Sequence, residues 1–259
     1  MLDLAMKVLF FRIREIYFSE YPYDVEGCPF VHFPSCKNKV EADGFTRVDY
    51  LTSVIDLTQD LDTIWRKLDY KSSRLPIKRA QREGIKVNIN RDYDEFWQIN
   101  RSFQRKKGFG PILGIGTPRV EIMKRYGTLF TAEYEGEILG GNIYLEDEAN
   151  IRAWRWASTR LKVDREKAAL IGRANRLLCW EAIQYAKEKG MKEFDWAGLA
   201  SKEEANRDKG KKGRNSYKLS FGGEIVTRYS YRKISSKAYK LSYFLYNLAN
   251  SVVGKVRER

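Results

Sequence analysis

Lys218 lies in surroundings that suggest chemistry. It falls in "NSYKLSFGG", residues 215–223, between Tyr217 and Leu219 and shortly before the glycines Gly222 and Gly223. A lysine flanked by aromatic side chains and glycine backbone would sit in reduced dielectric, where its charge acts strongly. Such a cation could stabilise negative charge that develops during a reaction. The alternative is a lysine on the solvent face of a strand, with its methylenes lying along apolar neighbours.

Asp195 is the second candidate for a chemical role. It lies in "EFDWAG", between Phe194 and Trp196, where the pattern predicts a strand. Aspartate has a poor strand propensity, so this position calls for a reason. The carboxylate could orient a substrate amine or accept its proton. It could equally be a strand-end carboxylate that is paired with a lysine or arginine.

Clusters of basic residues could hold phosphate groups. One cluster recurs at helical spacing and comprises Arg74, Lys78, Arg79 and Arg82. A second lies in a glycine-broken loop and comprises Arg207, Lys209, Lys211, Lys212 and Arg214. A third lies near the start of a predicted helix and comprises Arg173 and Arg176. The first could follow a diphosphate or an RNA backbone. The loop could close over an anionic substrate, and the third could place phosphate at a helix N-terminus. Solvated surface charge is the alternative for all three clusters.

Trp154 and Trp156 alternate with other residues in one predicted strand. Alternation predicts that both rings point to the same face of the sheet. They could form a stacking platform for a sugar or a base, or they could belong to the hydrophobic core.

The sequence has little to support metal or covalent catalysis. Its cysteines are Cys28, Cys36 and Cys179, and His32 is its one histidine. Cys28, His32 and Cys36 match no familiar zinc spacing and lack a fourth ligand, so we expect no metal site. There is neither a G-x-S-x-G motif nor a Cys–His arrangement for a nucleophile. Reduced cysteines indicate a cytoplasmic protein.

Length and charge bound the remaining possibilities. The chain has 259 residues and a net charge of +14, which attracts nucleic acid, anionic lipid or nucleotide-linked substrates. No run of 18 apolar residues occurs, and the N-terminal arginines argue against a secretory signal.

Hydrophobic periodicity predicts the elements that must position these side chains. We expect a strand at 52–58, helices capped by Thr58 and ended by Gly84, a strand at 85–89 and a helix at 94–108. A three-stranded meander follows at 127–159. The remaining predictions are a helix at 169–190, a strand at 191–200, a loop at 201–215, a hairpin-like element at 216–234 and a helix at 236–253. This order indicates an α+β fold.

Four segments together resemble the FemAB-like branch of the GNAT superfamily. They are "VIDLT…IWRKLDYKSSRLPIKRAQREGIKV", "LFTAEYEGEILGGNIYL", "RLLCWEAIQYAKEKGMKEFDWAGLA" and "YKLSFGG", and the similarity covers about residues 50–235. The resemblance implies a GNAT fold with a mixed central sheet flanked by helices, and acyl donors that lie where two central strands splay apart. Members of this branch transfer aminoacyl groups from aminoacyl-tRNA to an amine of a peptidoglycan precursor.

The resemblance also implies roles for individual residues. Lys218 matches the lysine of the family's "FK…FG" element, with Tyr217 in the aromatic position, and would stabilise an oxyanion. Gly172 and Ala174 are placed like the end of the acetyltransferase phosphate-binding loop, although the leading basic residue would fall at Ala169. The implied donor is aminoacyl-tRNA or an acyl thioester such as acyl-CoA, with no further cofactor. The acceptor would be a phosphorylated cell-envelope precursor.

Two departures from the family shape the expected domain organisation. Residues 1–50 can form only a truncated N-terminal subdomain, and the helical arm of some members is missing. We therefore expect a remnant at 1–50, a GNAT-like catalytic domain at 51–235 and a C-terminal helix at 236–259.

A second class of function fits the charge equally well. The chain could be a basic module without chemistry that binds RNA or an anionic membrane. The aromatic C-terminal helix, flanked by lysines and arginines, could lie on the inner face of a membrane. The sequence does not indicate an oligomeric state.

Overall fold

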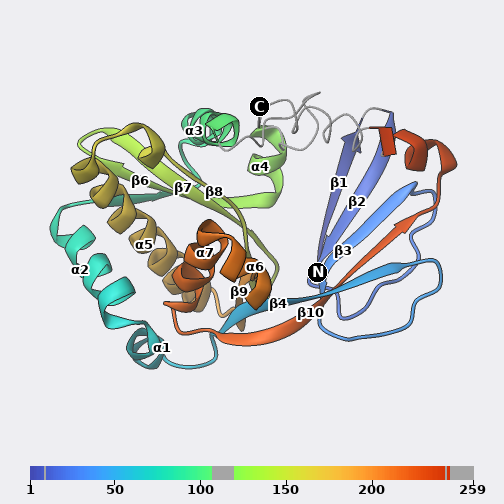
Figure 1. Ribbon diagram of the computed structural model, residues 1–259, viewed down its shortest axis with the longest axis horizontal. Helices are drawn as coiled ribbons and strands as arrows, with labels where there is room; N and C mark the ends of the chain where they lie inside the picture. The colour runs from blue at the N-terminus through green and yellow to red at the C-terminus, as the bar shows by residue number, and fades with distance from the viewer. Residues whose placement is uncertain (9, 107–119, 243, 246–259) are drawn as a thin grey trace. The chain divides into compact units, whose positions relative to one another are not determined.

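A computed structural model of the protein describes residues 1–8, 10–106, 120–242 and 244–245 (Figure 1). The chain divides into two units. The larger comprises Leu51–Lys107 and Pro118–Val226, and the smaller comprises the remainder. Glycines and prolines at 108–118 predict a loop, and this segment lies outside the described residues. The end of the predicted helix at 236–253 also lies outside them.

The larger unit is built on a mixed sheet. Its strands follow the order β4-β9-β8-β7-β6-β5, and neighbours are antiparallel except for the parallel pair β8 and β9. The strands are β4 (Thr46–Asp56, in this unit from Leu51 on), β5 (Lys86–Ile89), β6 (Gly127–Tyr134), β7 (Glu137–Glu146), β8 (Asn150–Ser158) and β9 (Glu193–Gly198). The predicted meander at 127–159 is therefore confirmed as β6, β7 and β8.

Helices cover both faces of this sheet. Consecutive residues Leu129 and Phe130 of β6 enter different hydrophobic clusters, so these clusters lie on opposite faces. The cluster of Phe130 contains side chains from α1 (Leu61–Lys67), α2 (Leu75–Arg82) and α5 (Arg165–Glu188). The cluster of Leu129 contains side chains from α3 (Tyr93–Lys106) and α4 (Val120–Tyr126). The predicted α+β fold with a mixed sheet flanked by helices is confirmed.

Local capping sets where the helices begin. Helix α1 has Asp60 as its N-cap, whose carboxylate accepts a hydrogen bond from Thr63 N, so the prediction that Thr58 caps it was wrong. A π-helical turn η1 (Tyr70–Arg74) precedes α2, and a 3₁₀ turn η2 (Thr159–Lys162) precedes α5. Helix α5 begins directly after its N-cap Asp164. Gly190, which has φ of +75°, follows the end of this helix.

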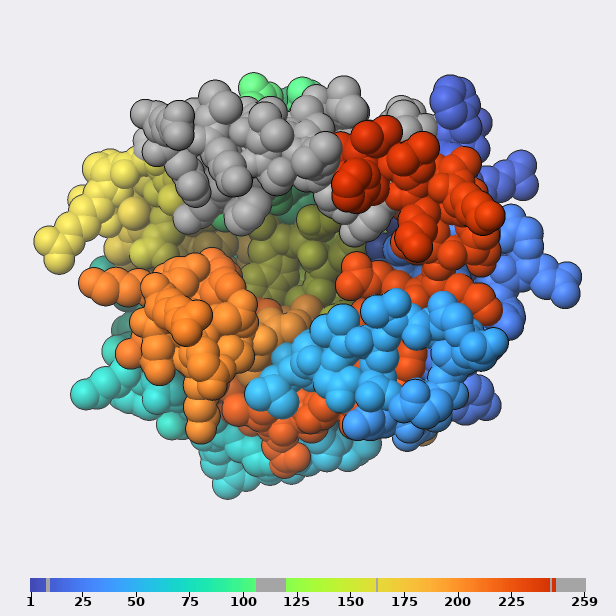
Figure 2. Space-filling view, turned by 45° about the vertical axis from the view of Figure 1, so that its right-hand side comes forward, coloured from blue at the N-terminus to red at the C-terminus, as the bar shows by residue number. Residues whose placement is uncertain are grey.

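The largest correction concerns residues 201–219. The predicted loop and the first part of the predicted hairpin are two helices, α6 (Lys202–Arg207) and α7 (Lys209–Leu219), which lie at the surface in orange (Figure 2). Ser201 and Glu204 form a capping box that starts α6. The Asp208 carboxylate accepts hydrogen bonds from Gly210 N and Lys211 N and starts α7. These caps outweigh the low helix propensity of the glycines inside α7.

The smaller unit contains four neighbouring strands and has its own hydrophobic core. Its strands follow the order β1-β2-β3-β10, with β2 and β3 parallel and the other neighbours antiparallel. They are β1 (Leu2–Val8), β2 (Phe11–Tyr17), β3 (Phe30–Cys36) and β10 (Glu224–Ile234, in this unit from Thr227 on). Residues 237–242 and 244–245 are helical. Among the described residues, no helix is both long and apolar enough to cross a bilayer.

Candidate functional site

The site lies where β8 and β9 separate. The two strands pair in parallel at three positions, and the last pair joins Arg152 and Asp195. Both strands then continue, β8 to Ser158 and β9 to Gly198. Beyond Arg152 and Asp195, the backbone N–H and C=O groups on the facing edges of β8 and β9 therefore no longer pair with each other.

A buried ion pair closes the paired segment. Arg152 and Asp195 have exposed fractions of 7% and 2%, and Arg152 Nη1 donates to Asp195 Oδ2. Asp195 Oδ1 accepts from Ala197 N at 2.8 Å and from the Thr52 hydroxyl at 2.5 Å. These contacts tie the Asp195 carboxylate to β4, to β8 and to the backbone of β9, so it holds the strand end in place.

The end of β9 presents two backbone carbonyls. Ala197 has φ of +59°, a left-handed conformation that a side chain with a β carbon rarely adopts, and its N–H is held by Asp195. The carbonyl oxygens of Ala197 and Gly198 accept hydrogen bonds from Lys218 Nζ, at 3.2 and 2.7 Å. The structure thus brings Lys218 and Asp195 together, because both side chains bind the backbone at the end of β9.

Lys218 is electrostatically unusual. It lies near the end of α7, so the prediction that it belongs to a hairpin-like element was wrong, and its side chain is half-buried. Burial of the ammonium group lowers the pKa of Lys218 from 10.5 to about 8. The Asp195 carboxylate opposes this shift, and the charges of Arg152 and Arg214 add to it. The side chain therefore stays largely protonated at neutral pH but can lose its proton slightly above it.

Aromatic rings pack beside Lys218. Trp156 of β8 and Trp196 of β9 meet edge to face with centroids 5.6 Å apart, so the rings of the two separating strands touch. Tyr217 lies 5.9 Å from Trp156, and Phe221 lies 4.6 Å from Trp196. The indole N–H groups of both tryptophans are buried, and neither has a hydrogen-bond partner among the residues that the structure describes.

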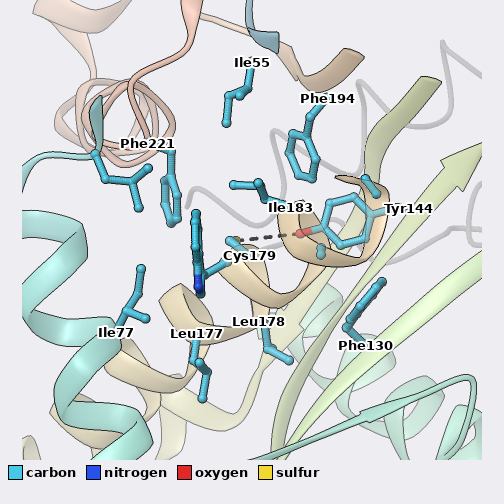
Figure 3. Packing of buried hydrophobic residues seen from close by; sticks show 14 of the residues in the cluster. Ile55, Ile77, Phe130, Tyr144, Leu177, Leu178, Cys179, Ile183, Phe194 and Phe221 are labelled. Carbon is cyan, nitrogen blue, oxygen red and sulfur yellow. Dashed lines mark hydrogen bonds between the residues drawn. The ribbon is translucent and has the colours of Figure 1, made fainter. Parts of the chain in front are cut away.

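Tyr217 also joins a buried polar cluster that connects α7 with α5 and β7. Its hydroxyl donates to Asn175 O at 3.0 Å and lies 3.4 Å from Cys179 Sγ. Tyr144 donates to the same sulfur, which Figure 3 shows among the surrounding core residues. Burial raises the pKa of Cys179 to about 11, so the thiol is protonated at neutral pH and is not a nucleophile.

Trp154 and Trp156 do not form a common platform. Their strand carries a bulge opposite Ile143 and Tyr144, where the register shifts by one residue. The extra residue reverses the alternation, so Trp156 packs in the cluster of α5 and Trp154 packs in the cluster of α3 on the opposite face. The prediction that both rings share a face was therefore wrong.

Arg173 and Arg176 do not lie at a helix N-terminus. Helix α5 begins at Arg165, so both residues and Gly172 lie well inside it, and the acetyltransferase-like phosphate loop expected here is absent from residues 169–176. Arg173 makes a bidentate ion pair with Glu83, and each of its two hydrogen bonds is 2.7 Å long. Arg176 donates to Ser72 O and lies over the Tyr217 ring. Both guanidinium groups hold α5 to its neighbours.

The other predicted basic residues divide between surface and site. Arg74 is half-buried and stacks on Tyr70, while Lys78 is exposed beside Trp65. On α7, Lys211 pairs with Glu204, whereas Arg214 is exposed one turn before Lys218 and so shares its helix face. Arg74 and Lys78 belong to η1 and α2, so they are not part of the strand end that holds Lys218.

Two residues of the site were not predicted from the sequence. Arg152 and Thr52 are buried polar side chains in predicted strands, and this position alone could have marked them as partners of Asp195. Among the described residues, no group of three or more histidine, cysteine or acidic side chains could hold a metal ion.

Solved structures share this fold, although no protein-family model and no curated protein matches the sequence. FemX is 12% identical over 96% of this chain and 86% of its own, with a TM-score of 0.62. The C-terminal domain of a protein assigned as a lysylphosphatidylglycerol synthetase from Agrobacterium fabrum is 12% identical over 95% of this chain and 87% of its own, with a TM-score of 0.57. L-PGS from Bacillus licheniformis is 14% identical over 95% and 85%, with a TM-score of 0.54. The chain therefore has the FemAB-like, GNAT-type fold.

Proposed function

We propose that this protein is an acyltransferase that forms an amide bond. It transfers an aminoacyl or acyl group from an activated donor to an amine of a phosphorylated cell-envelope precursor, and aminoacyl-tRNA is the favoured donor. The observation that carries this proposal is the position of Lys218, a half-buried cation beside the point where β8 and β9 separate. The folds shared with FemX and the lysylphosphatidylglycerol synthetases support transferase chemistry.

Lys218 would act on the tetrahedral intermediate. An ammonium group has three N–H donors, and the carbonyls of Ala197 and Gly198 account for two of them. The third is available to the oxygen that becomes negatively charged when the amine attacks the donor carbonyl. The proton that the amine releases passes to the leaving hydroxyl or thiol, so no covalent enzyme intermediate is needed.

Asp195 would act through the strand end and not on the substrate. Its hydrogen bond to Ala197 N fixes the end of β9, whose carbonyls hold Lys218, and Arg152 and Thr52 hold the carboxylate in place. It is therefore a positioning residue in this mechanism.

Two features favour aminoacyl-tRNA over coenzyme A. A pantetheine arm inserted between β8 and β9 would have to displace the touching rings of Trp156 and Trp196. The segment around Gly172 is helical, so its amide groups are engaged within α5 and are not free to bind a pyrophosphate. The exposed cation Arg214, which shares the face of Lys218, can instead meet the phosphates of a larger polyanion.

The test is transfer of labelled aminoacyl groups from tRNA into an envelope-precursor extract. We expect Lys218→Met to lower turnover by about 100-fold or more while tRNA binding persists, since removing one oxyanion donor has effects of this size. Label that moves only from acyl-CoA would replace the tRNA donor by a thioester. If neither donor is used and tRNA or lipid binds in a salt-sensitive manner, the basic binding module is the correct alternative.

A further inference from the structure

The smaller unit exposes large apolar side chains on two neighbouring elements. Phe10, in the turn between β1 and β2, is 89% exposed. Leu241, Phe244 and Leu245, in the helical segment after β10, are 60%, 61% and 53% exposed. We call these four side chains the apolar surface. Figure 1 shows the red helix next to the end of the β1–β2 hairpin, and Figure 2 shows the same red segment at the surface.

The helical segment is anchored through its opposite side. Ser236 starts it by accepting a hydrogen bond from Tyr239 N. The Tyr239 ring is buried, 5.2 Å from Phe11 and 5.3 Å from Phe30. At 100° per residue, positions 241, 244 and 245 lie on the side of the helix away from Tyr239. The same anchor therefore presents the apolar stripe to solvent and keeps it beside the hairpin that carries Phe10.

Only positive charges surround this surface in the sequence. Lys7, Arg12, Lys237 and Lys240 flank the apolar side chains and are exposed. No aspartate or glutamate occurs between residues 4 and 14 or between residues 225 and 257. An apolar centre with a purely cationic border complements a surface that is apolar inside and anionic outside, which is the composition of an anionic bilayer. RNA would satisfy the cations but would leave the aliphatic side chains in water.

We propose that the apolar surface docks the protein on anionic membrane. Phe10, Leu241, Phe244 and Leu245 enter the boundary between head groups and acyl chains, and the four cations contact lipid phosphates. This inference uses the smaller unit alone and does not rest on Lys218 or on the transfer reaction. If transfer fails and docking holds, the proposed function falls and the docking surface remains.

Vesicle cosedimentation tests the proposal. The full-length protein is mixed with vesicles of phosphatidylcholine alone or of phosphatidylcholine with phosphatidylglycerol. We expect binding to the anionic vesicles to fall about tenfold or more in Leu241→Ser/Phe244→Ser, because two buried apolar side chains are lost. Lys237→Glu/Lys240→Glu should weaken binding about fivefold per residue. Ile225→Ser and Lys86→Glu change residues of the same kind and exposure elsewhere and should bind normally.

A labelled variant gives an independent measurement of whether position 10 enters the membrane. A polarity-sensitive dye on Phe10→Cys should shift its emission to the blue with anionic vesicles, whereas the same dye on Ile225→Cys should not. The three native cysteines are buried, so labelling is selective. Unchanged vesicle binding by a folded Leu241→Ser/Phe244→Ser protein overturns the proposal. A wild-type protein that binds neither kind of vesicle overturns it as well. A wild-type dimer that this variant converts to a monomer, without vesicle binding, assigns the surface to a second copy instead.

Discussion

At the scale of single residues, Lys218 combines a lowered pKa with two hydrogen bonds to the backbone. Its ammonium group is partly removed from water and donates to the carbonyls of Ala197 and Gly198 at the end of β9, which Asp195 fixes. The role proposed for it requires the protonated form. The lowered pKa therefore limits the pH range in which Lys218 could play this role.

We expect transfer to decline as pH rises through about 8, because Lys218 loses its proton there. Lys218→Arg keeps its charge over this range and should show no decline, although its overall rate falls because a guanidinium group has a different shape. The measurement is the pH profile of turnover for both proteins. A wild-type rate that instead rises through pH 8 would mean that neutral Lys218 acts as a base.

The same shift predicts a pH-dependent contribution to stability. The native pKa of Lys218 lies below 10.5, so between about 8 and 10.5 the unfolded chain binds more protons than the native protein. Raising the pH through this window therefore stabilises the wild type relative to Lys218→Met. The difference between their free energies of unfolding, measured by urea denaturation at about pH 7 and about pH 10, should move in favour of the wild type. An unchanged difference would show that the pKa is not lowered.

Arg152 is expected to matter for stability more than exposed arginines do. Arg152→Met leaves the buried Asp195 without its cation and should lower the free energy of unfolding by about 3 kcal/mol or more. Arg79→Met breaks an exposed pair with Glu83 and should cost less than about 1 kcal/mol. Urea denaturation measures both. Equal effects would mean that the Arg152–Asp195 pair is not buried in solution.

At the scale of elements, the end of α7 depends on a glycine. Gly222 has φ of +74°, and a β carbon there would lie 2.5 Å from Lys67 O. The chain can therefore make this turn after α7 only with a glycine at position 222. This turn connects the helix that carries Lys218 to β10.

We expect Gly222→Ala to destabilise the protein more than Gly190→Ala. Gly190 has nearly the same φ, +75°, but a β carbon there meets no atom within 4 Å. Gly190→Ala should therefore cost only the backbone strain of about 1 kcal/mol, and Gly222→Ala should add the clash with Lys67. Thermal unfolding of the two variants measures the difference. Equal losses would mean that Lys67 moves away freely.

At the scale of the whole molecule, the net charge of +14 governs encounters with polyanions. Counterion release makes such binding steeply dependent on salt and insensitive to any one lysine. The catalysis proposed for Lys218 would have the opposite character, because it would depend on one side chain. The two contributions can therefore be separated by experiment.

Binding of unfractionated tRNA should weaken about tenfold or more between roughly 50 and 200 mM salt. Lys218→Met should bind tRNA nearly as well as the wild type at each salt concentration, since it removes one charge among many. Fluorescence anisotropy measures both. A large loss of affinity in Lys218→Met would place this lysine in donor binding and not in the chemical step.

Several features of this protein follow from its sequence alone. The alternation in residues 127–159 predicts β6, β7 and β8, and the helical spacing of apolar residues predicts α1, α3 and α5. These signals are local, because each depends on the period of one element. The basic charge and the resemblance to the FemAB-like fold also needed no coordinates.

The tertiary structure decided what these elements do together. Arg152 and Asp195 are 43 residues apart and meet only because β8 and β9 pair in that register. A bulge of one residue sends Trp154 and Trp156 to opposite faces of the sheet. Caps at Ser201 and Asp208 start two helices, and the second of them, α7, carries Lys218. Register, bulges and burial arise from contacts between distant segments, and the period of a single element carries no information about them.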